Sequence, residues 1–218
     1  MTLFFQNNSK YFDAIVLLDD ESADATFDLA QHEKILLKVK KKRKEFNDLE
    51  NRNILLNLVS FFKHRWVCFI DADELLDDRF ANIDFFSQNE KIDSILLNLV
   101  HLWDDEKHYN IDYPYTYRGI SHKLRMFRNI GRSQIISKEG KLHFNPVPYT
   151  GNIYHAPILI NHYGHLNKET RKQKYDFYMK EDTEHCQKDY KHLINDNIEK
   201  GKVQDISIDN LQKMHTII

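Results

Sequence analysis

Residues 66–76, WVCFIDADELL, run from a short apolar segment directly into a cluster of carboxylates. The first part, residues 66–70, is continuously apolar and holds β-branched and aromatic residues, which is typical of a strand covered on both faces of a parallel sheet. Asp71 and Asp73 follow at once, separated by a small alanine. Side chains two apart in extended backbone point to the same side. We therefore expect the two carboxyl groups within about 8 Å of each other, at the carboxyl edge of the sheet.

Two further apolar runs also end in acidic residues. Residues 12–18 (FDAIVLL) precede the acids at 19–21, and residues 94–102 (SILLNLVHL) precede the acids at 104–106. The carboxyl ends of parallel strands meet at one edge of a sheet, so the three acidic clusters are expected to converge on one rim. Such a rim repels an anionic substrate unless it holds a divalent cation. The pattern therefore predicts a metal site.

The segment between the first two runs predicts a helix. In residues 45–63, apolar side chains fall near a period of 3.6 residues, with polar positions between them. A strand, a helix and a strand in this order form a parallel α/β unit with a right-handed crossover. Residues 113–136 mix tyrosine, glycine and short apolar stretches, which favours antiparallel hairpins.

The C-terminal part of the sequence predicts helices. Asn167 is suited to cap one helix, and a second is expected from about Asp182, with Cys186, Tyr190, Leu193 and Asn197 on one stripe. The expected fold is α/β: a mostly parallel sheet flanked by helices, an antiparallel hairpin region, and a helical extension over residues 166–218. The sequence shows no internal repeat and no linker, so residues 1–218 are expected to form one domain.

Composition argues against several classes of protein. Lys and Arg number 31 against 33 Asp and Glu, and the resulting net charge of -2 argues against a dedicated nucleic-acid binder. Cys68 and Cys186 are far apart, so neither a disulfide framework nor a zinc ribbon is expected. No apolar run approaches the roughly 18 residues of a membrane span, and the start lacks a signal-peptide pattern, which predicts a cytoplasmic protein. The basic run from Lys38 to Lys44 fits either a solvated face or a peripheral contact with anionic lipid at the inner face of the membrane.

Two acidic motifs together resemble a known family. DDxSxDxT at residues 19–26 stands about fifty residues before DADE at residues 71–74. This order and spacing are similar to glycosyltransferase family 2, which has the GT-A fold. Further segments resemble one bacterial branch of that family: NRN at 51–53, KLRMFRN at 123–129, LH at 142–143, and HYG at 162–164 before a Lys-rich helix that contains Tyr175. The resemblance extends over residues 11–182.

The resemblance implies a metal-dependent glycosyltransferase that moves a sugar from a nucleotide-sugar donor to a hydroxyl of a glycan or lipid-linked acceptor. Inversion at the sugar and a place in surface polysaccharide or glycoconjugate synthesis are implied as well. Carried over to this chain, Asp20 or its neighbour Asp19 would accept a hydrogen bond from the nucleobase. Asp71 would sit by the ribose or diphosphate, and Asp73 would bind Mn²⁺ or Mg²⁺, which eases departure of the nucleoside diphosphate. Arg52 would add a fixed cation beside them.

The chain departs from the family's pattern near its start. Members of the family begin with a strand and a helix ahead of the Asp-Asp turn, whereas only residues 1–10 stand ahead of the matching region here. The resemblance then implies that the central strand is absent, with a gap between residues 12–18 and residues 66–70. The His-Glu pair of the branch is altered too, since LHF at residues 142–144 lacks the acid.

An inverting transfer needs a general base that deprotonates the acceptor hydroxyl. Asp104, Asp105 and Glu139 are candidates by position. Asp105 is favoured because it follows a buried strand and should face the rim. The alternative for Asp105 is a solvated loop acid beside Lys107.

His162 is the candidate second metal ligand. It follows residues 157–160 (PILI), a short apolar strand that returns the chain toward the rim, and Gly164 allows a tight bend there. Imidazole is an acceptable Mn²⁺ ligand beside carboxylates, and many GT-A enzymes resembling this chain use a late His or Asp in that role. A ring nitrogen of His162 is then expected within about 5 Å of an Asp73 oxygen. A zinc site is a further alternative for the twelve histidines, which include His162 and His165 with His185 and Cys186 later, but they lack the compact spacing of zinc ligands.

Three other functions fit part of the pattern. A phosphatase of the haloacid dehalogenase type also has Asp-x-Asp at a strand end, but it wants Thr or Val where this chain has Leu75, and a nucleophilic Asp near the chain start. A nucleotidyltransferase usually has a Gly-rich phosphate loop, whereas this chain has only six glycines. A degenerate or truncated GT-A module that binds without turnover is favoured by the missing first strand.

Overall fold

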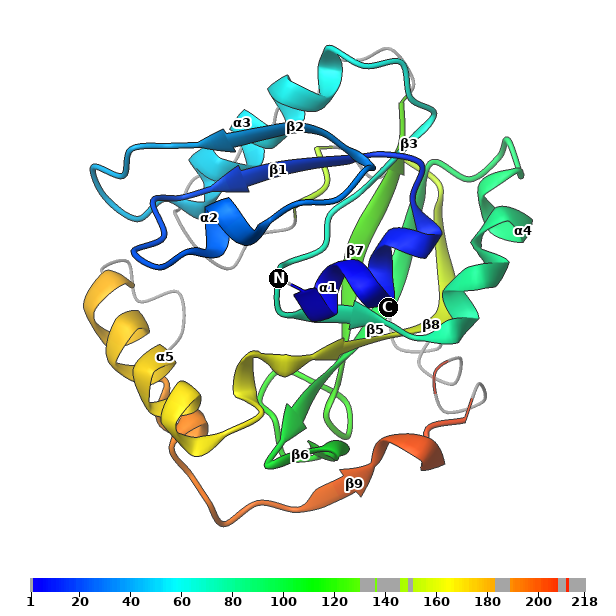
Figure 1. Ribbon diagram of the computed structural model, residues 1–218. Coiled ribbons are helices and arrows are strands. Elements are labelled where there is room, and N and C mark those ends of the chain that lie inside the picture. Colours follow the sequence, from blue (N-terminus) through cyan, green and yellow to red (C-terminus); the bar gives the residue numbers. More distant parts are fainter. Residues whose placement is uncertain are drawn as a thin grey trace.

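The computed structural model describes residues 2–129, 136, 146–148, 151–182, 189–207 and 211. Its strands form a two-stranded sheet and a curled, seven-stranded sheet (Figure 1). The small sheet contains β1 (Ile15–Asp19) and β2 (Ile35–Lys40). The large sheet contains β3 (Trp66–Cys68), β4 (Glu74–Leu76), β5 (Ser94–Trp103), β6 (Asp105–Asn110), β7 (Ile120–Arg128), β8 (Ile153–His162) and β9 (Lys200–Lys202).

Helices lie around the edges of these sheets (Figure 1). No described helix is both long and apolar enough to cross a lipid bilayer. The α-helices are α1 (Thr2–Asn8), α2 (Thr26–Leu29), α3 (Asp48–Ser60), α4 (Ile83–Ser87) and α5 (Lys168–Glu181). The single-turn 3-10 helices are η1 (Ser9–Tyr11), η2 (Asp78–Asn82), η3 (Tyr163–His165), η4 (Lys191–Leu193) and η5 (Val203–Asp205).

β5 is the centre of the large sheet. It pairs antiparallel with β7 on one side and parallel with β8 on the other, while β3 lies beyond β7 and β4 beyond β8. Ile95, Leu97 and Leu99 on β5 are at most 2% exposed and pack in the main core with residues of β8. The buried strand predicted over residues 94–102 is confirmed by this central position.

The prediction of a mostly parallel sheet is wrong, although the α/β class is correct. Among the described pairings, β1–β2 and β5–β8 are parallel and the others are antiparallel. The physical reason lies in the connections. A parallel crossover needs a dozen or more residues, usually including a helix. β5 ends at Trp103 and β6 begins at Asp105, so the chain has room only to turn back.

The small sheet contains β2, a strand that the sequence patterns did not predict. Its residues, ILLKVK, enter the basic run, and the lysines obscure the apolar pattern. β1 and β2 are parallel with α2 between them in the chain, so they form a small βαβ unit. In the part of the chain that the structure describes, β1 and β3 stand at the edges of different sheets and do not pair. The expected unit of residues 12–18 and 66–70 therefore does not form, and a separation remains between them.

α3 confirms the helix predicted over residues 45–63. Asn47 is its N-cap, and the Asn47 side chain accepts a hydrogen bond from the Glu50 backbone N–H at 2.9 Å. Leu56 on the inner face is 1% exposed and packs in a second core cluster with Val67 and Phe127 of the large sheet. α3 also contacts β1. The helix therefore joins the small sheet to the large one.

The C-terminal extension is helical only in part. Asn167 caps α5 as predicted, since its side chain accepts from the Thr170 backbone N–H at 2.8 Å. Farther along, the described chain forms β9, which pairs with β6. Gly201 is required there, because a Cβ at that position would lie 2.6 Å from the ring of Tyr109. The helix predicted from about Asp182 is wrong where the chain is described, because residues 189–199 contain only the 3-10 turn η4 and no α-helix. Residues 183–188, Cys186 among them, lie outside the described residues.

Candidate functional site

α3 holds two acidic turns at the same end of the molecule. The first turn follows β1 and contains Asp20; the second follows β3 and contains Asp71. The Asn51 side chain donates to Asp20 Oδ2 at 3.1 Å, and the neighbouring Arg52 donates to Asp71 Oδ1 at 2.5 Å. Two adjacent residues of one helix therefore bind both turns. The convergence of these two acidic clusters, expected from the sequence, is present in the structure.

Asp71 lies between two guanidinium groups. Besides the bond from Arg52, Arg125 Nη1 of β7 lies 3.6 Å from Asp71 Oδ2. Burial raises the pKa of Asp71, but Arg52 and Arg125 outweigh it and lower that pKa to about 2. Asp71 is therefore ionised at neutral pH and already neutralised by fixed cations.

Glu74 supports the second turn from beneath. Its Oε2 accepts from the Asp71 backbone N–H at 3.1 Å, and the Glu74 N–H donates to the Asp71 carbonyl at 3.0 Å. Arg125 donates to Glu74 Oε1, and both side chains are almost completely buried. Burial raises the pKa of Glu74, while the charge of Arg125 opposes that rise. The turn is thus closed by hydrogen bonds at both of its ends.

Asp73 faces a different set of partners. Its Oδ2 lies 3.2 Å from His162 Nε2 and 2.9 Å from Lys174 Nζ of α5. Burial raises the pKa of Asp73, but His162 and Lys174 outweigh it and hold that pKa well below its usual range. Gly164 makes this contact possible, because a Cβ there would lie 2.2 Å from Asp73 Oδ2 and 2.0 Å from Lys174 Nζ. The glycine is needed for close approach and not for an unusual backbone angle.

The rim is therefore compensated in charge rather than acidic. Arg52 and Arg125 face Asp71, while Lys174 and His162 face Asp73. An anionic ligand is therefore not repelled by uncompensated carboxylates, because Arg52, Arg125 and Lys174 supply the positive charge that the acidic pattern alone would require from a metal. Whether a metal ion binds at this rim therefore depends on which side chains there can act as its ligands.

The donor set around Asp73 fits a divalent cation, whereas that around Asp71 does not. Lys174 Nζ stands between Asp73 Oδ2 and His162 Nε2, at 2.9 Å and 3.4 Å, so a cation already occupies the space between an anionic oxygen and an imidazole nitrogen. A metal ion could take that place if the flexible lysine moved aside. Both oxygens of Asp71 are engaged by arginines. His162 lies within the distance of Asp73 expected from the sequence.

The acidic turn after β1 is held mainly by the basic run. Asp19 is buried and accepts a hydrogen bond from the Ser22 backbone N–H at 2.9 Å. Asp20 receives Arg43 Nε at 3.0 Å and has Lys41 Nζ at 3.5 Å. Lys38 Nζ donates to the Phe27 carbonyl at 2.7 Å. Much of the run from Lys38 to Lys44 therefore makes contacts inside the chain.

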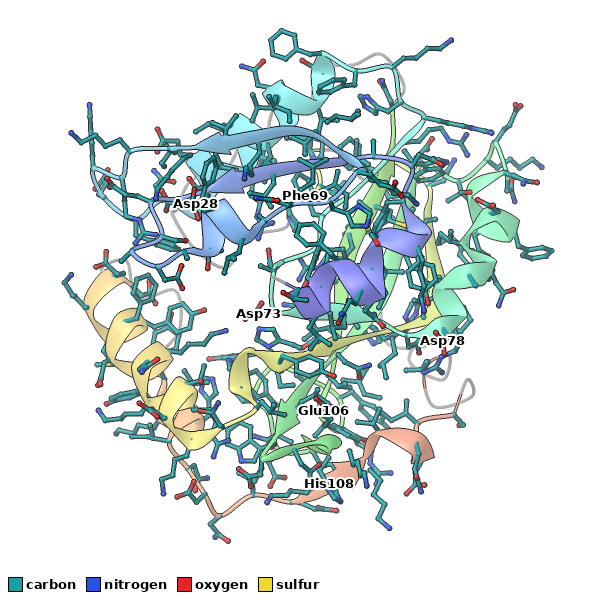
Figure 2. All side chains as sticks on the ribbon, viewed as in Figure 1. Asp28, Phe69, Asp73, Asp78, Glu106 and His108 are labelled. Carbon is teal, nitrogen blue, oxygen red and sulfur yellow. The ribbon has the colours of Figure 1, made fainter. Side chains whose placement is uncertain are left out.

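Asp105 does not join these residues. Its carboxylate accepts from the backbone N–H groups of Lys107 and His108 and from the His108 ring, and it is exposed at the start of β6. Figure 2 shows Glu106 and His108, which flank this turn, well away from Asp73. None of the described contacts of Asp105 reaches Asp71 or Asp73, because β5 and β6 form a hairpin and Asp105 bonds within it. Its exposure fits the solvated alternative, and its role as catalytic base stays a prediction.

The other two candidate bases are also without support at the rim. Asp104 pairs with Arg171 at 3.1 Å and with Lys200, which ties β5 to α5 and β9. Glu139 lies outside the described residues.

A buried histidine cluster adjoins Asp73 and was missed in the sequence. His101 on β5 stands opposite His162 on β8, and their Nδ1 atoms are 2.8 Å apart. His165 in η3 stacks on His101 with ring centroids 4.7 Å apart. The only signal in the sequence is the spacing His-x-x-His at 162 and 165, since His101 is brought in by the strand register. The compact spacing that the sequence lacks is therefore supplied by the fold.

Known proteins add no assignment to this geometry. A scan against protein families and a search of the curated proteins both found no match to the chain. Its function must therefore be inferred from the residues and their contacts.

Proposed function

We propose that this protein is a metal-dependent glycosyltransferase that moves a sugar from a nucleotide-sugar donor to a hydroxyl acceptor with inversion, in a GT-A-like arrangement. One observation carries the proposal: Asp71 and Asp73, two residues apart after β3, face two different sets of cations at the end of the molecule that also holds Asp20. Two carboxylates with different partners suit two different tasks.

The first task is recognition of the nucleoside. In this proposal Asp20, with Asp19 behind it, accepts a hydrogen bond from the nucleobase. Asp71 lies by the ribose and diphosphate. Its partners Arg52 and Arg125 carry the positive charge that a diphosphate requires, and guanidinium groups suit planar contacts with phosphate oxygens.

The second task is stabilisation of the leaving group. Asp73 and His162 would hold Mn²⁺ or Mg²⁺, which supplies charge compensation for the departing nucleoside diphosphate. Burial lowers the pKa of Lys174, but Asp73 outweighs it and raises that pKa, so Lys174 stays charged. When displaced from Asp73, the Lys174 ammonium is placed to contact a phosphate oxygen. The charge of the diphosphate is then opposed by residues of three separate elements.

A binding module without turnover is the second candidate. It is favoured by the separation of β1 from β3, which the resemblance associates with a missing central strand. It is also consistent with an Asp73 whose charge is compensated by Lys174 without a metal. Such a module would bind a nucleotide sugar or its glycan product without releasing nucleoside diphosphate.

The two candidates are separated by turnover of a donor panel. The full chain is incubated with nucleotide sugars and Mn²⁺ or Mg²⁺, and release of nucleoside diphosphate is measured. We expect the protein to hydrolyse at least one donor in a metal-dependent reaction. Asp73→Asn should lower that rate about 100-fold or more, which is the usual effect of removing a group that stabilises charge in the transition state. Asp176→Asn on the exposed face of α5, where Asp176 pairs only with Lys172 in the described contacts, is the matched control and should retain the rate.

Donor binding without release would favour the binding module. Release that is equally fast in Asp73→Asn would contradict the assignment of Asp73.

A further inference from the structure

Three histidines converge from two strands and a turn. β5 and β8 are parallel neighbours, and their register places His101 directly beside His162. The chain then enters η3, in which residues three apart lie on the same side, and this brings His165 to the other two rings. One ring nitrogen from each histidine lies within 4.8 Å of the others. A tetrahedral zinc site with Zn–N bonds of 2.0–2.1 Å needs nitrogens about 3.3 Å apart. Metal binding therefore requires the nitrogens to move closer and the stacked rings of His101 and His165 to tilt toward a common point.

The bonding of the cluster is incomplete. His165 is 3% exposed, and its Nδ1 has no hydrogen-bond partner among the described residues. A buried ring nitrogen without a partner is costly, because it has lost water and gained nothing in return. His101 and His162 share a single contact through Nδ1. A metal ion bound to these nitrogens would satisfy all three rings at once.

Asp73 is placed as an outer partner of this cluster. Histidines that bind metals commonly donate their second ring N–H to a carboxylate, which fixes the ring and its protonation. His162 shows this arrangement: Nδ1 faces His101, while Nε2 lies 3.2 Å from Asp73 Oδ2. A proton on Nε2 serves Asp73 and leaves the lone pair of Nδ1 directed into the cluster.

We propose that His101, His162 and His165 bind a transition-metal ion, Zn²⁺ by preference, in a site distinct from the carboxylate rim, with Asp73 as the carboxylate that orients His162. Three nitrogen ligands favour zinc over Mg²⁺, which prefers oxygen. Three protein ligands also leave one tetrahedral position for a water molecule. This proposal does not rest on glycosyl transfer. Where it holds, His162 reaches Asp73 as a hydrogen-bond donor and is no longer the second ligand of a rim metal.

The charge states of His101 and His165 suit metal binding. Burial, together with nearby positive groups, holds the pKa values of His101 and His165 well below their usual range. The groups that face the cluster include Lys174 and His192, and Tyr113 stacks on His101 with centroids 3.7 Å apart. Neutral imidazole is the form of histidine that binds a metal, and a low pKa of His101 and His165 favours that form.

Zinc binding by the full chain tests the proposal. The protein is stripped with a chelator, and its affinity for Zn²⁺ is measured by competition with a chromophoric chelator at neutral pH. We expect one equivalent of Zn²⁺ to bind. Asp73→Asn removes only the outer partner and should weaken Zn²⁺ binding roughly 10- to 100-fold. His101→Gln and His165→Gln each remove a ligand and should weaken Zn²⁺ binding more than Asp73→Asn does. His108→Gln, at a histidine that pairs with Asp105 on the β6 hairpin, is the matched control and should bind as the parent does.

Co²⁺ absorption of the unmodified chain guards against variants that fail to fold. A site with three histidines should give the intense visible bands of tetrahedral Co²⁺. Weak bands typical of octahedral oxygen ligation would place the ion at the carboxylates and overturn the proposal. It is overturned equally if the chain binds no Zn²⁺, or if folded His101→Gln and His165→Gln proteins bind Zn²⁺ with unchanged affinity.

Discussion

Glu74 and Arg125 form an ion pair beneath the Asp71 turn, with side chains only 2% and 7% exposed. A buried pair of this kind adds little compared with apolar residues, but removal of one partner leaves an uncompensated charge. We expect Arg125→Met to lower the free energy of unfolding by about 3–5 kcal/mol, measured by urea denaturation.

The double variant Glu74→Gln/Arg125→Met separates charge from packing. It removes the orphaned carboxylate and should recover a substantial part of the lost stability. A cost below about 1 kcal/mol for Arg125→Met would show that Glu74 reaches water or another partner, contrary to the described burial.

At the residue scale, the sequence indicates the carboxylates but not their partners. Asp71 and Asp73 stand out because they directly follow an apolar run. Arg125 and Lys174 lie 51 and 101 residues away from the carboxylates Glu74 and Asp73 that they contact, and nothing in their local sequence indicates these pairings. For this reason the acidic pattern alone does not require a metal ion at the rim, and the metal stays a prediction.

Among the elements, α1 protects an exposed strand edge. Asn8 is fully buried; its Nδ2 donates to the Glu74 carbonyl at 2.8 Å and its Oδ1 accepts from the Leu76 N–H at 3.0 Å. One amide side chain thus makes the hydrogen bonds to two backbone groups of β4 that a neighbouring strand would otherwise make. Asn8→Ala leaves two backbone groups unsatisfied, and we expect it to cost about 1–3 kcal/mol for each in chemical denaturation.

Gln6→Ala, at an exposed position of the same helix, is the control and should change stability by less than about 0.5 kcal/mol. Equal effects of the two substitutions would argue that α1 contributes only helix propensity and does not cap β4.

Elements with strong local patterns were predicted and those fixed by distant contacts were not. β5 contains a continuous apolar run and α3 a helical apolar period, and each pattern is visible within its own segment. β2 carries lysines whose ammonium groups are satisfied by backbone carbonyls, as with Lys38 at Phe27, and this is invisible in a hydropathy pattern. β9 is a three-residue strand that exists only because β6 offers an edge. Sheet direction failed similarly, since it depends on which strands pair.

For the whole molecule, the candidate site lies where elements from distant parts of the sequence meet. The turn after β1 brings Asp20, α3 brings Arg52, the turn after β3 brings Asp71 and Asp73, and α5 brings Lys174. Figure 2 labels Asp73 among them. Each contribution carries charge, and positive and negative groups balance locally as they do over the chain. A site of this kind can open to an anionic ligand when flexible cations such as Lys174 exchange a carboxylate for a phosphate.

The most direct test of this account is the binding of nucleoside diphosphates by titration calorimetry, with and without Mn²⁺, in the parent chain, Asp73→Asn and Asp176→Asn. We predict that at least one nucleoside diphosphate binds, that Mn²⁺ strengthens its binding, and that Asp73→Asn removes this gain, a loss of about tenfold or more that corresponds to about 1.4 kcal/mol. Asp176→Asn should bind like the parent. Absence of binding by every nucleoside diphosphate, or binding that neither Mn²⁺ nor Asp73→Asn alters, would contradict a metal-dependent nucleotide-sugar site at Asp71 and Asp73.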